Sequence, residues 1–272
     1  MMTITRITTQ KKNNNRYNIY VDDGGGETYG FSVDEAVLIE YRLRKGLEMS
    51  EAMVSELTEK DSFYQSYALA IRYLGYRMRT KKEVADYLQK KDVSPHNISA
   101  TIDRLTTNGL LDDEQFANAF VQTRINTSSK GPLLIEQELL KKGVSRGQCT
   151  RALQRYDDSI QYEKALKWVQ KKIHSRKKES YRKKEQRLQA ALIRKGFTQD
   201  VVQDVLDAVQ MTKNDEEQRE ALIYHGEKLR RKYERKFTKQ TLANKLKEGL
   251  YRRGFTLEEI NEYINCLIEK DL

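Results

Sequence analysis

The chain has 272 residues, of which 38% are hydrophobic and 33% charged, and it carries a formal net charge of +10. Typical globular domains contain about 45–50% apolar and about 25% charged residues, so this composition argues against one large compact core. It also argues against a membrane protein, because no run approaches the roughly 20 apolar residues of a membrane span. With no secretory signal at the N-terminus, we expect a cytoplasmic protein, and its positive charge favours partners that carry phosphate or carboxylate groups.

Residues 1–57 form the first predicted region, a small β-hairpin followed by a helix. Residues 3–10 and 16–21 alternate and are rich in β-formers, residues 22–26 read DDGGG and predict a turn, and residues 29–31 predict a short third strand. Ser32 and Glu35 have the spacing of a capping box, which predicts a helix from there to about Gly46. A second short helix is expected near 50–58, before the first repeat begins.

A short phrase is then written four times: LQKKDVS at 88–94, LLKKGVS at 139–145, LIRKGFT at 192–198 and LYRRGFT at 250–256. Apolar residues at helical spacing precede each phrase, and the Gly, or Asp92 in the first copy, stands where a helix end favours a left-handed residue. The final Ser or Thr is followed by apolar residues four, eight and eleven positions later, which predicts that its hydroxyl caps a new helix. Each phrase therefore predicts a helix, a stop and a second helix.

The phrases follow one another at 51, 53 and 58 residues, which leaves room for one further helix in each repeat. We expect these helices at about 61–77, 112–126, 158–177 and 214–235. The predicted fold is all-α, an elongated tandem array of four three-helix, helix-turn-helix-like repeats behind the N-terminal region. The predicted boundaries of the repeats are 61–110, 111–157, 158–211 and 212–272.

Two basic runs are the candidate binding residues. Residues 164–187 hold eleven Lys or Arg against two Glu, and residues 228–239 place further cations at helical spacing on one face. Such a surface can neutralise the phosphates of nucleic acid, with an affinity that falls as salt rises. The predicted nucleic-acid or filament contacts are Lys167, Lys171, Lys172, Arg176, Lys177, Lys178, Arg182, Lys183, Lys184, Arg187, Lys228, Arg231, Lys232 and Arg235.

Both runs also have a simpler interpretation, since lysine-rich helix faces are commonly just solvated. The aromatic residues Trp168, Tyr181 and Tyr233 lie in or beside the runs, where they could stack on bases. Trp168 follows Ala165 by three along the apolar stripe, which favours a place in the core instead. The sequence leaves both alternatives open.

No group of residues predicts catalysis, a metal or a cofactor. Gly24–Gly26 lacks the spacing of a phosphate-binding loop and predicts a hairpin turn. The acidic residues 112–114 precede Phe116 and predict the cap and first turn of a helix, where carboxylates suit the helix dipole. The two cysteines and three histidines lack metal-ligand spacing. We therefore expect a protein that is not an enzyme and needs no cofactor.

The segments YALAIRYLGYRMRTKKEVADYLQKK (67–91), IDRLTTNGLLDDEQFANAFV (102–121) and KGPLLIEQELLKKGVS (130–145) closely resemble the RecX family, bacterial regulators of the RecA recombinase. The residues that match the family pattern are Leu74, Arg77, Arg79, Thr80, Glu83, Leu88, Gly109, Leu110, Leu111, Asp112, Asp113, Phe116, Gly131 and Pro132. The resemblance is strongest over 64–145, weaker to about 210, and carried beyond that mainly by the repeat. The hairpin and helix expected in 1–46 are similar to that family's N-terminal segment.

The resemblance implies an array of three-helix repeats that lodges in the groove of the RecA–DNA filament, contacts protein and DNA together, and modulates filament growth, ATP hydrolysis and strand exchange. We expect it to inhibit RecA in recombination, DNA repair and the SOS response, and to act as a monomer. Single-stranded and double-stranded DNA are both expected partners. Two rival interpretations stay open. One is a sequence-specific helix-turn-helix regulator that reads DNA from the outward face of 95–107 through His96, Asn97, Asp103 and Arg104. The other is a helical scaffold that binds only protein.

Overall fold

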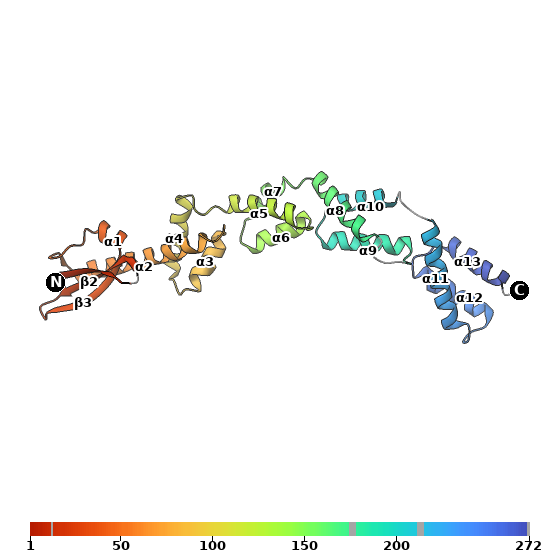
Figure 1. Ribbon diagram of the computed structural model, residues 1–272, viewed down its shortest axis with the longest axis horizontal. Coiled ribbons are helices and arrows are strands. Elements are labelled where there is room, and N and C mark those ends of the chain that lie inside the picture. The colour runs from red at the N-terminus through yellow and green to blue at the C-terminus, as the bar shows by residue number, and fades with distance from the viewer. Residues whose placement is uncertain (12, 174–177, 211–214, 271–272) are drawn as a thin grey trace. The chain divides into compact units, whose positions relative to one another are not determined.

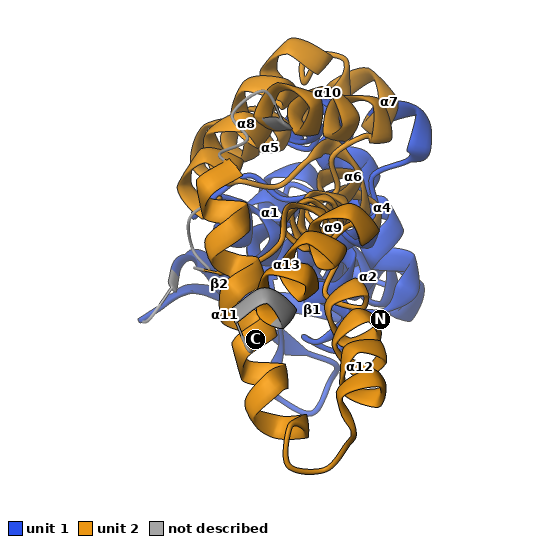
Figure 2. Ribbon diagram, turned by 90° about the vertical axis from the view of Figure 1, so that its right-hand side faces the viewer, with its two compact units in different colours: residues 1–117, 141–148 blue, residues 118–140, 149–272 orange. Residues whose placement is uncertain are grey.

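The computed structural model describes residues 1–11, 13–173, 178–210 and 215–270. Within these residues the fold is mostly helical, with four strands near the N-terminus and thirteen helices (Figure 1). The chain divides into two compact units, which Figure 2 shows in different colours. Unit 1 comprises residues 1–117 and 141–148, and unit 2 comprises residues 118–140 and 149–272.

The N-terminal sheet has the strand order β3-β2-β1-β4, and every neighbouring pair is antiparallel. Its strands are β1 (Met2–Gln10), β2 (Asn13–Asp22), β3 (Glu27–Asp34) and β4 (Glu48–Met49). The predicted turn at 24–26 connects β2 to β3, where the Asp22 side chain accepts hydrogen bonds from two of the glycine N–H groups. One face of the sheet packs on helix α1 and the start of α2. The strand β4 was not predicted from the sequence.

The predicted capping box at Ser32 and Glu35 is wrong. Ser32 lies within β3, and helix α1 (Glu35–Glu40) is capped by Asp34, whose side chain accepts from the N–H of Ala36. A contact between strands explains the difference. Arg16, on the neighbouring strand, donates to the hydroxyl of Ser32 at 3.0 Å, so this hydroxyl is engaged within the sheet and does not cap the helix. The helix also ends at Glu40, well before Gly46.

The two helices predicted at 50–58 and 61–77 are one helix, α2 (Glu51–Leu74). No proline or glycine interrupts this stretch, so nothing in it breaks the helix. Ser50 caps its start by accepting from the N–H of Met53 at 3.2 Å. The buried carboxylate of Asp61 binds Arg16 and the backbone N–H of Asp34, which fastens the middle of α2 to the sheet.

The remaining helices follow the predicted pattern of three-helix repeats, whose exact residue boundaries stay a prediction. They are α3 (Lys81–Gln89), α4 (Pro95–Thr107), α5 (Asp113–Thr127), α6 (Pro132–Lys141), α7 (Arg146–Leu153), α8 (Asp158–Lys172), α9 (Tyr181–Arg194), α10 (Gln199–Gln210), α11 (Asp215–Tyr233), α12 (Lys239–Tyr251) and α13 (Leu257–Lys270). Separate apolar clusters form between α2, α3 and α4, between α8, α9 and α10, and between α11, α12 and α13.

The helix stops are confirmed. Asp92, Gly143, Gly196 and Gly254 all have positive φ angles, of 58°, 89°, 82° and 87°. Hydroxyl caps follow at Ser94, Ser145 and Thr256, which each accept from an N–H three residues later. Thr198 differs, since its hydroxyl donates to the side chain of Gln161 at 3.4 Å.

The repeated phrase also joins one repeat to the next. The residue before its glycine is Lys142, Lys195 or Arg253, and in each case its backbone carbonyl accepts a hydrogen bond from the start of the middle helix of the preceding repeat. The donors are the Thr80 hydroxyl, the Gly131 N–H and the Ser180 hydroxyl. Side chains near the start of the following repeat add to two of these joints, where Asp113 accepts from the N–H of Lys81 and Gln218 from that of Tyr181.

Candidate nucleic-acid interface

The first basic run extends from α8, through a loop, to α9. Lys167, Lys171 and Lys172 are exposed on α8, and Arg176 and Lys177 lie outside the described residues. Lys178 is exposed in the loop, with a positive φ of 65°. The structure therefore places four described lysines of the run in solvent before α9 begins.

The cations of α9 fall into two classes. Arg182 and Lys183 are exposed. Lys184 has a side chain only 13% exposed and pairs with Glu217 at 3.5 Å, and Arg187 pairs with Glu179 at 2.9 Å. Because carboxylates already neutralise these last two cations, they have less charge to offer a phosphate than their neighbours.

The second run does not form one continuous helical face. Helix α11 ends at Tyr233, so Arg235 lies in the turn that follows and Lys239 begins α12. The prediction of one face is therefore wrong for Arg235 and Lys239, which lie beyond the end of α11 at Tyr233. Lys228, Arg231 and Lys232 are exposed in the last turns of α11.

The two runs meet around an exposed tyrosine of unit 2. Nζ of Lys178, from the first run, lies 4.2 Å from the ring centroid of Tyr224 on α11. Both residues line a groove together with Lys228 and Arg231 from the second run, and Ile223 and two glutamates complete it. We call this surface, defined by Lys178, Tyr224, Lys228 and Arg231, the basic groove. It combines positive charge with an aromatic ring, the two features used to bind single-stranded nucleic acid.

A histidine fixes the loop at the basic groove. His225 donates from Nε2 to the backbone carbonyl oxygen of Lys178 at 2.8 Å. Burial lowers the pKa of His225 below its usual value, so the ring stays neutral at pH 7. The contact holds Lys178 beside α11 in a backbone conformation that non-glycine residues seldom adopt.

Tyr224 was not among the residues predicted from the sequence. It precedes Lys228 by four positions and Arg231 by seven, which places all three on one face of α11. That spacing is the signal that could have identified it.

The three aromatic residues in or beside the basic runs, Trp168, Tyr181 and Tyr233, lie against neighbouring side chains. Trp168 packs on the core of α8, α9 and α10, with Nζ of Lys195 5.1 Å from its ring. Tyr233 packs on the core of α11, α12 and α13. Tyr181 lines a cavity at the start of α9. The positions of Trp168 and Tyr233 favour the core interpretation over base stacking.

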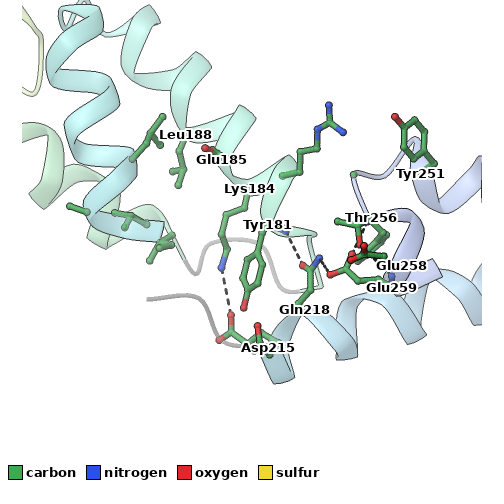
Figure 3. Close-up of a pocket in the computed structure, with 18 of the residues that line it drawn as sticks. Tyr181, Lys184, Glu185, Leu188, Asp215, Gln218, Tyr251, Thr256, Glu258 and Glu259 are labelled. Carbon is green, nitrogen blue, oxygen red and sulfur yellow. Dashed lines mark hydrogen bonds and ion pairs between the residues drawn. The ribbon is translucent and has the colours of Figure 1, made fainter. Parts of the chain in front are cut away.

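That cavity, of about 1120 Å³, is larger than the basic groove but less suited to an anion (Figure 3). Gln218 bridges it, accepting from the N–H of Tyr181 at 2.9 Å and donating to Glu259 at 2.8 Å. Its lining includes the carboxylates of Glu185, Asp215, Glu217, Glu258 and Glu259. These charges oppose phosphate, so the smaller basic groove is the better site for an anion.

Within the part of the chain that the structure describes, no cluster of three or more His, Cys, Asp or Glu side chains could hold a metal ion. The helices of that same part include none with the length and apolar character that crossing a membrane requires.

Four family models match the sequence along most of its length. They are the regulatory protein RecX N-terminal domain at residues 2–50 and the first and second RecX three-helix domains at 67–105 and 112–153. The model of the third RecX three-helix domain matches twice, at 159–206 and 215–264. The double match agrees with the four repeats of the sequence.

Similar proteins and structures carry the same description. Regulatory protein RecX of Oceanobacillus iheyensis is 46% identical over 272 residues, the whole of both chains, and that of Bacillus cytotoxicus is 42% identical over 270 residues, 99% of this chain and 100% of its own. A crystal structure of regulatory protein RecX aligns with a TM-score of 0.69 and 33% identity, covering 76% of this chain and all of its own. The crystal structure of RecX from Lactobacillus salivarius aligns with a TM-score of 0.54 and 34% identity, covering 56% and 99%.

Proposed function

Because this chain belongs to the RecX family of regulatory proteins, we propose that it binds the RecA–DNA filament, contacts protein and DNA together, and inhibits the recombinase and its ATP hydrolysis. The action serves recombination and DNA repair, and the chain acts as a monomer in the cytoplasm. The chain needs no catalytic activity for this role, because its binding to the filament is enough to alter filament growth.

The basic groove is the observation that carries this proposal. Lys178 lies over the ring of Tyr224 and shares the groove with Lys228 and Arg231, so cations from two separate segments converge on one surface. Each phosphate that they neutralise releases counterions, which supplies affinity without a deep pocket. Helices α8 and α9 of the same unit carry further exposed cations.

The repeats suit a long, regular partner. Hydrogen-bonded joints hold neighbouring repeats together at Thr80, Gly131 and Ser180. Weak contacts that are connected in one chain bind with an effective concentration far above that of separate molecules, so total affinity rises with each added contact.

The helix-turn-helix alternative has less support in the structure. Asn97, one of the four residues expected to read bases from α4, is buried and donates from Nδ2 to the hydroxyl of Ser62 at 2.9 Å. His96 lies 3.9 Å from the carboxylate of Glu59. Asn97 is therefore committed to α2, and of the other three side chains one, Asp103, is an acid.

The test is ATP hydrolysis by RecA on single-stranded DNA with increasing amounts of the chain. We expect inhibition, and its stoichiometry separates two mechanisms. Inhibition far below one molecule per RecA subunit indicates capping of filament ends, and inhibition only near saturation indicates coating of the groove. A chain that leaves hydrolysis unchanged at every ratio would refute the proposal.

A further inference from the structure

Two tyrosines of unit 1, Tyr73 at the end of α2 and Tyr87 in α3, stack face to face. Their ring centroids are 4.0 Å apart and their planes differ by only 4°. Aromatic pairs usually prefer offset or edge-to-face arrangements, because both faces carry negative charge. Here a cation lies over each ring, with Cζ of Arg79 4.1 Å from the centroid of Tyr73 and Nζ of Lys91 6.0 Å from that of Tyr87. The cations offset the repulsion between the faces.

Arg79 is unusual among the partly buried cations of unit 1. Arg16 pairs with Asp61 at 2.8 Å, and Lys142 pairs with Glu83 at 2.7 Å. Arg79, by contrast, has no carboxylate partner among the described residues, and its Nε is buried without a hydrogen-bond partner. A guanidinium group offers five N–H donors in a planar fork. Stacking on Tyr73 orients that fork while leaving its charge uncompensated.

The loop that carries Arg79 also carries an isolated aromatic ring. Tyr76 lies three residues earlier, between α2 and α3, and is 86% exposed. Three residues of extended chain span at most about 11 Å, so the backbones of Tyr76 and Arg79 lie within reach of the same short stretch of a bound strand. Residues 71–92 around it contain seven Lys or Arg against three Asp or Glu.

We propose that Tyr76 and Arg79 form a second binding site for single-stranded nucleic acid, in which Arg79 binds a phosphate and Tyr76 stacks on a nearby base. The inference rests on the proposed function, since it adds a contact in unit 1 to the basic groove of unit 2. The basic groove also combines a cation with a tyrosine, at Lys178 and Tyr224.

Nucleic acid fits this surface better than an acidic protein segment. Tyr76 projects into solvent, so the face of its ring is accessible in the free chain. A base needs only an accessible ring face, and such stacking tolerates any sequence. The guanidinium group supplies the phosphate contact beside it.

The test measures binding of the full-length chain to a fluorescently labelled oligothymidine by anisotropy at several salt concentrations. Tyr76→Ala should weaken binding at least fivefold, the lower end of the effect of losing one base–aromatic stack, because its exposed side chain contributes little to folding. Arg79→Gln should also weaken binding and reduce the slope of log affinity against log salt by about 0.7, the contribution of one phosphate.

Arg44→Gln is the matched control, since Arg44 is an exposed arginine of unit 1 that lies between α1 and β4, outside the segment 71–92. It should change the affinity less than twofold. Thermal unfolding followed by circular dichroism verifies that each variant folds. An oligothymidine that contains iodouracil should also form a photo-cross-link to the 75–80 loop, mapped by mass spectrometry, and a merely structural role for these residues would give none.

The outcomes separate this site from the proposed function. A parent chain that neither binds the oligonucleotide at low salt nor inhibits RecA would refute both. If the parent binds and both variants bind equally well, only the second site is wrong. If the variants keep their affinity for the oligonucleotide but lose inhibition of RecA, the surface takes an acidic protein partner and the assignment to nucleic acid is overturned.

Discussion

The hydroxyl group of Thr80 donates a 2.6 Å hydrogen bond to the backbone carbonyl oxygen of Lys142, which lies 62 residues later in the chain. The same hydroxyl accepts from the N–H of Glu83 at 3.1 Å and so begins α3. One fully buried side chain therefore starts a helix and fastens it to the end of another.

Replacing Thr80 with Val should lower the free energy of unfolding by about 2 kcal/mol. About half of this loss comes from removal of the helix cap, and the rest from the carbonyl of Lys142, which loses its hydrogen-bond donor. Urea denaturation measures the change, which should shift the midpoint without altering the slope. Thr80→Ser keeps the hydroxyl and is the control. A Val variant as stable as the Ser variant would contradict the double role.

Gly196 should tolerate alanine worse than Gly109, although both have positive φ angles, of 82° and 69°. A Cβ atom on Gly196 would lie 2.6 Å from the backbone nitrogen of Leu134, whereas one on Gly109 meets nothing within 4 Å. The strained φ angle costs about 1–2 kcal/mol in either case, and crowding at Gly196 adds about as much again. Thermal unfolding of the two alanine variants gives the comparison. Equal losses of stability would show that the backbone around Gly196 and Leu134 can move to make room for the Cβ atom.

The ion pair between Arg16 and Asp61 should be the most sensitive contact of unit 1. Their side chains are only 14% and 7% exposed, so Asp61→Ala leaves a nearly buried cation without its partner and should cost about 3 kcal/mol. Glu27→Ala removes the carboxylate of the exposed pair with Arg6 and should change stability by less than about 1 kcal/mol. Denaturation of both variants in guanidinium chloride would reveal whether burial makes the difference.

Glu83 should contribute stability that is lost in acid. Burial acts to raise its pKa, but hydrogen bonds from Lys142, Arg77 and the N–H of Thr80 outweigh burial and hold the pKa below the usual value of 4.5. The stabilisation is therefore complete above the pKa of the unfolded chain and is lost as the pH falls through the lower pKa of the folded chain. Glu83→Gln should flatten this part of the stability profile, measured from about pH 7 to about pH 3. If the stability of the variant changes with pH as that of the parent chain does, other groups cause the loss of stability in acid.

Charge reversal in the basic groove should weaken DNA binding without unfolding the chain. Lys228→Glu with Arg231→Glu should reduce affinity for single-stranded DNA more than tenfold and lower the salt slope by about 0.7 for each lost phosphate contact. Lys247→Glu makes the same kind of change at an exposed position of α12 and is the control. Anisotropy titrations compare the parent chain with both variants. Because the double variant reverses two charges and the control one, a loss in log affinity only twice that of the control would indicate a response to net charge alone.

The sequence predicts those features of this fold that depend on neighbouring residues. Left-handed helix ends at Asp92, Gly143, Gly196 and Gly254 follow from local backbone preference, and all are confirmed. The cap assigned to Ser32 is wrong because Arg16 and Asp61, which redirect it, come from distant parts of the chain. The meeting of Lys178 with Tyr224 likewise depends on how a loop folds back on α11, which no local pattern predicts.

The hydrogen bonds that join neighbouring repeats explain how such a chain can lengthen over evolution. The second, third and fourth repeats carry a helix stop whose carbonyl accepts from the preceding repeat, and the first, second and third carry a helix start that donates to the following one. Duplication of one repeat within the gene therefore copies both halves of a new joint at once, and no compensating change is needed elsewhere. One family model matches both 159–206 and 215–264, so the third and fourth repeats share the sequence pattern that a copied repeat would have.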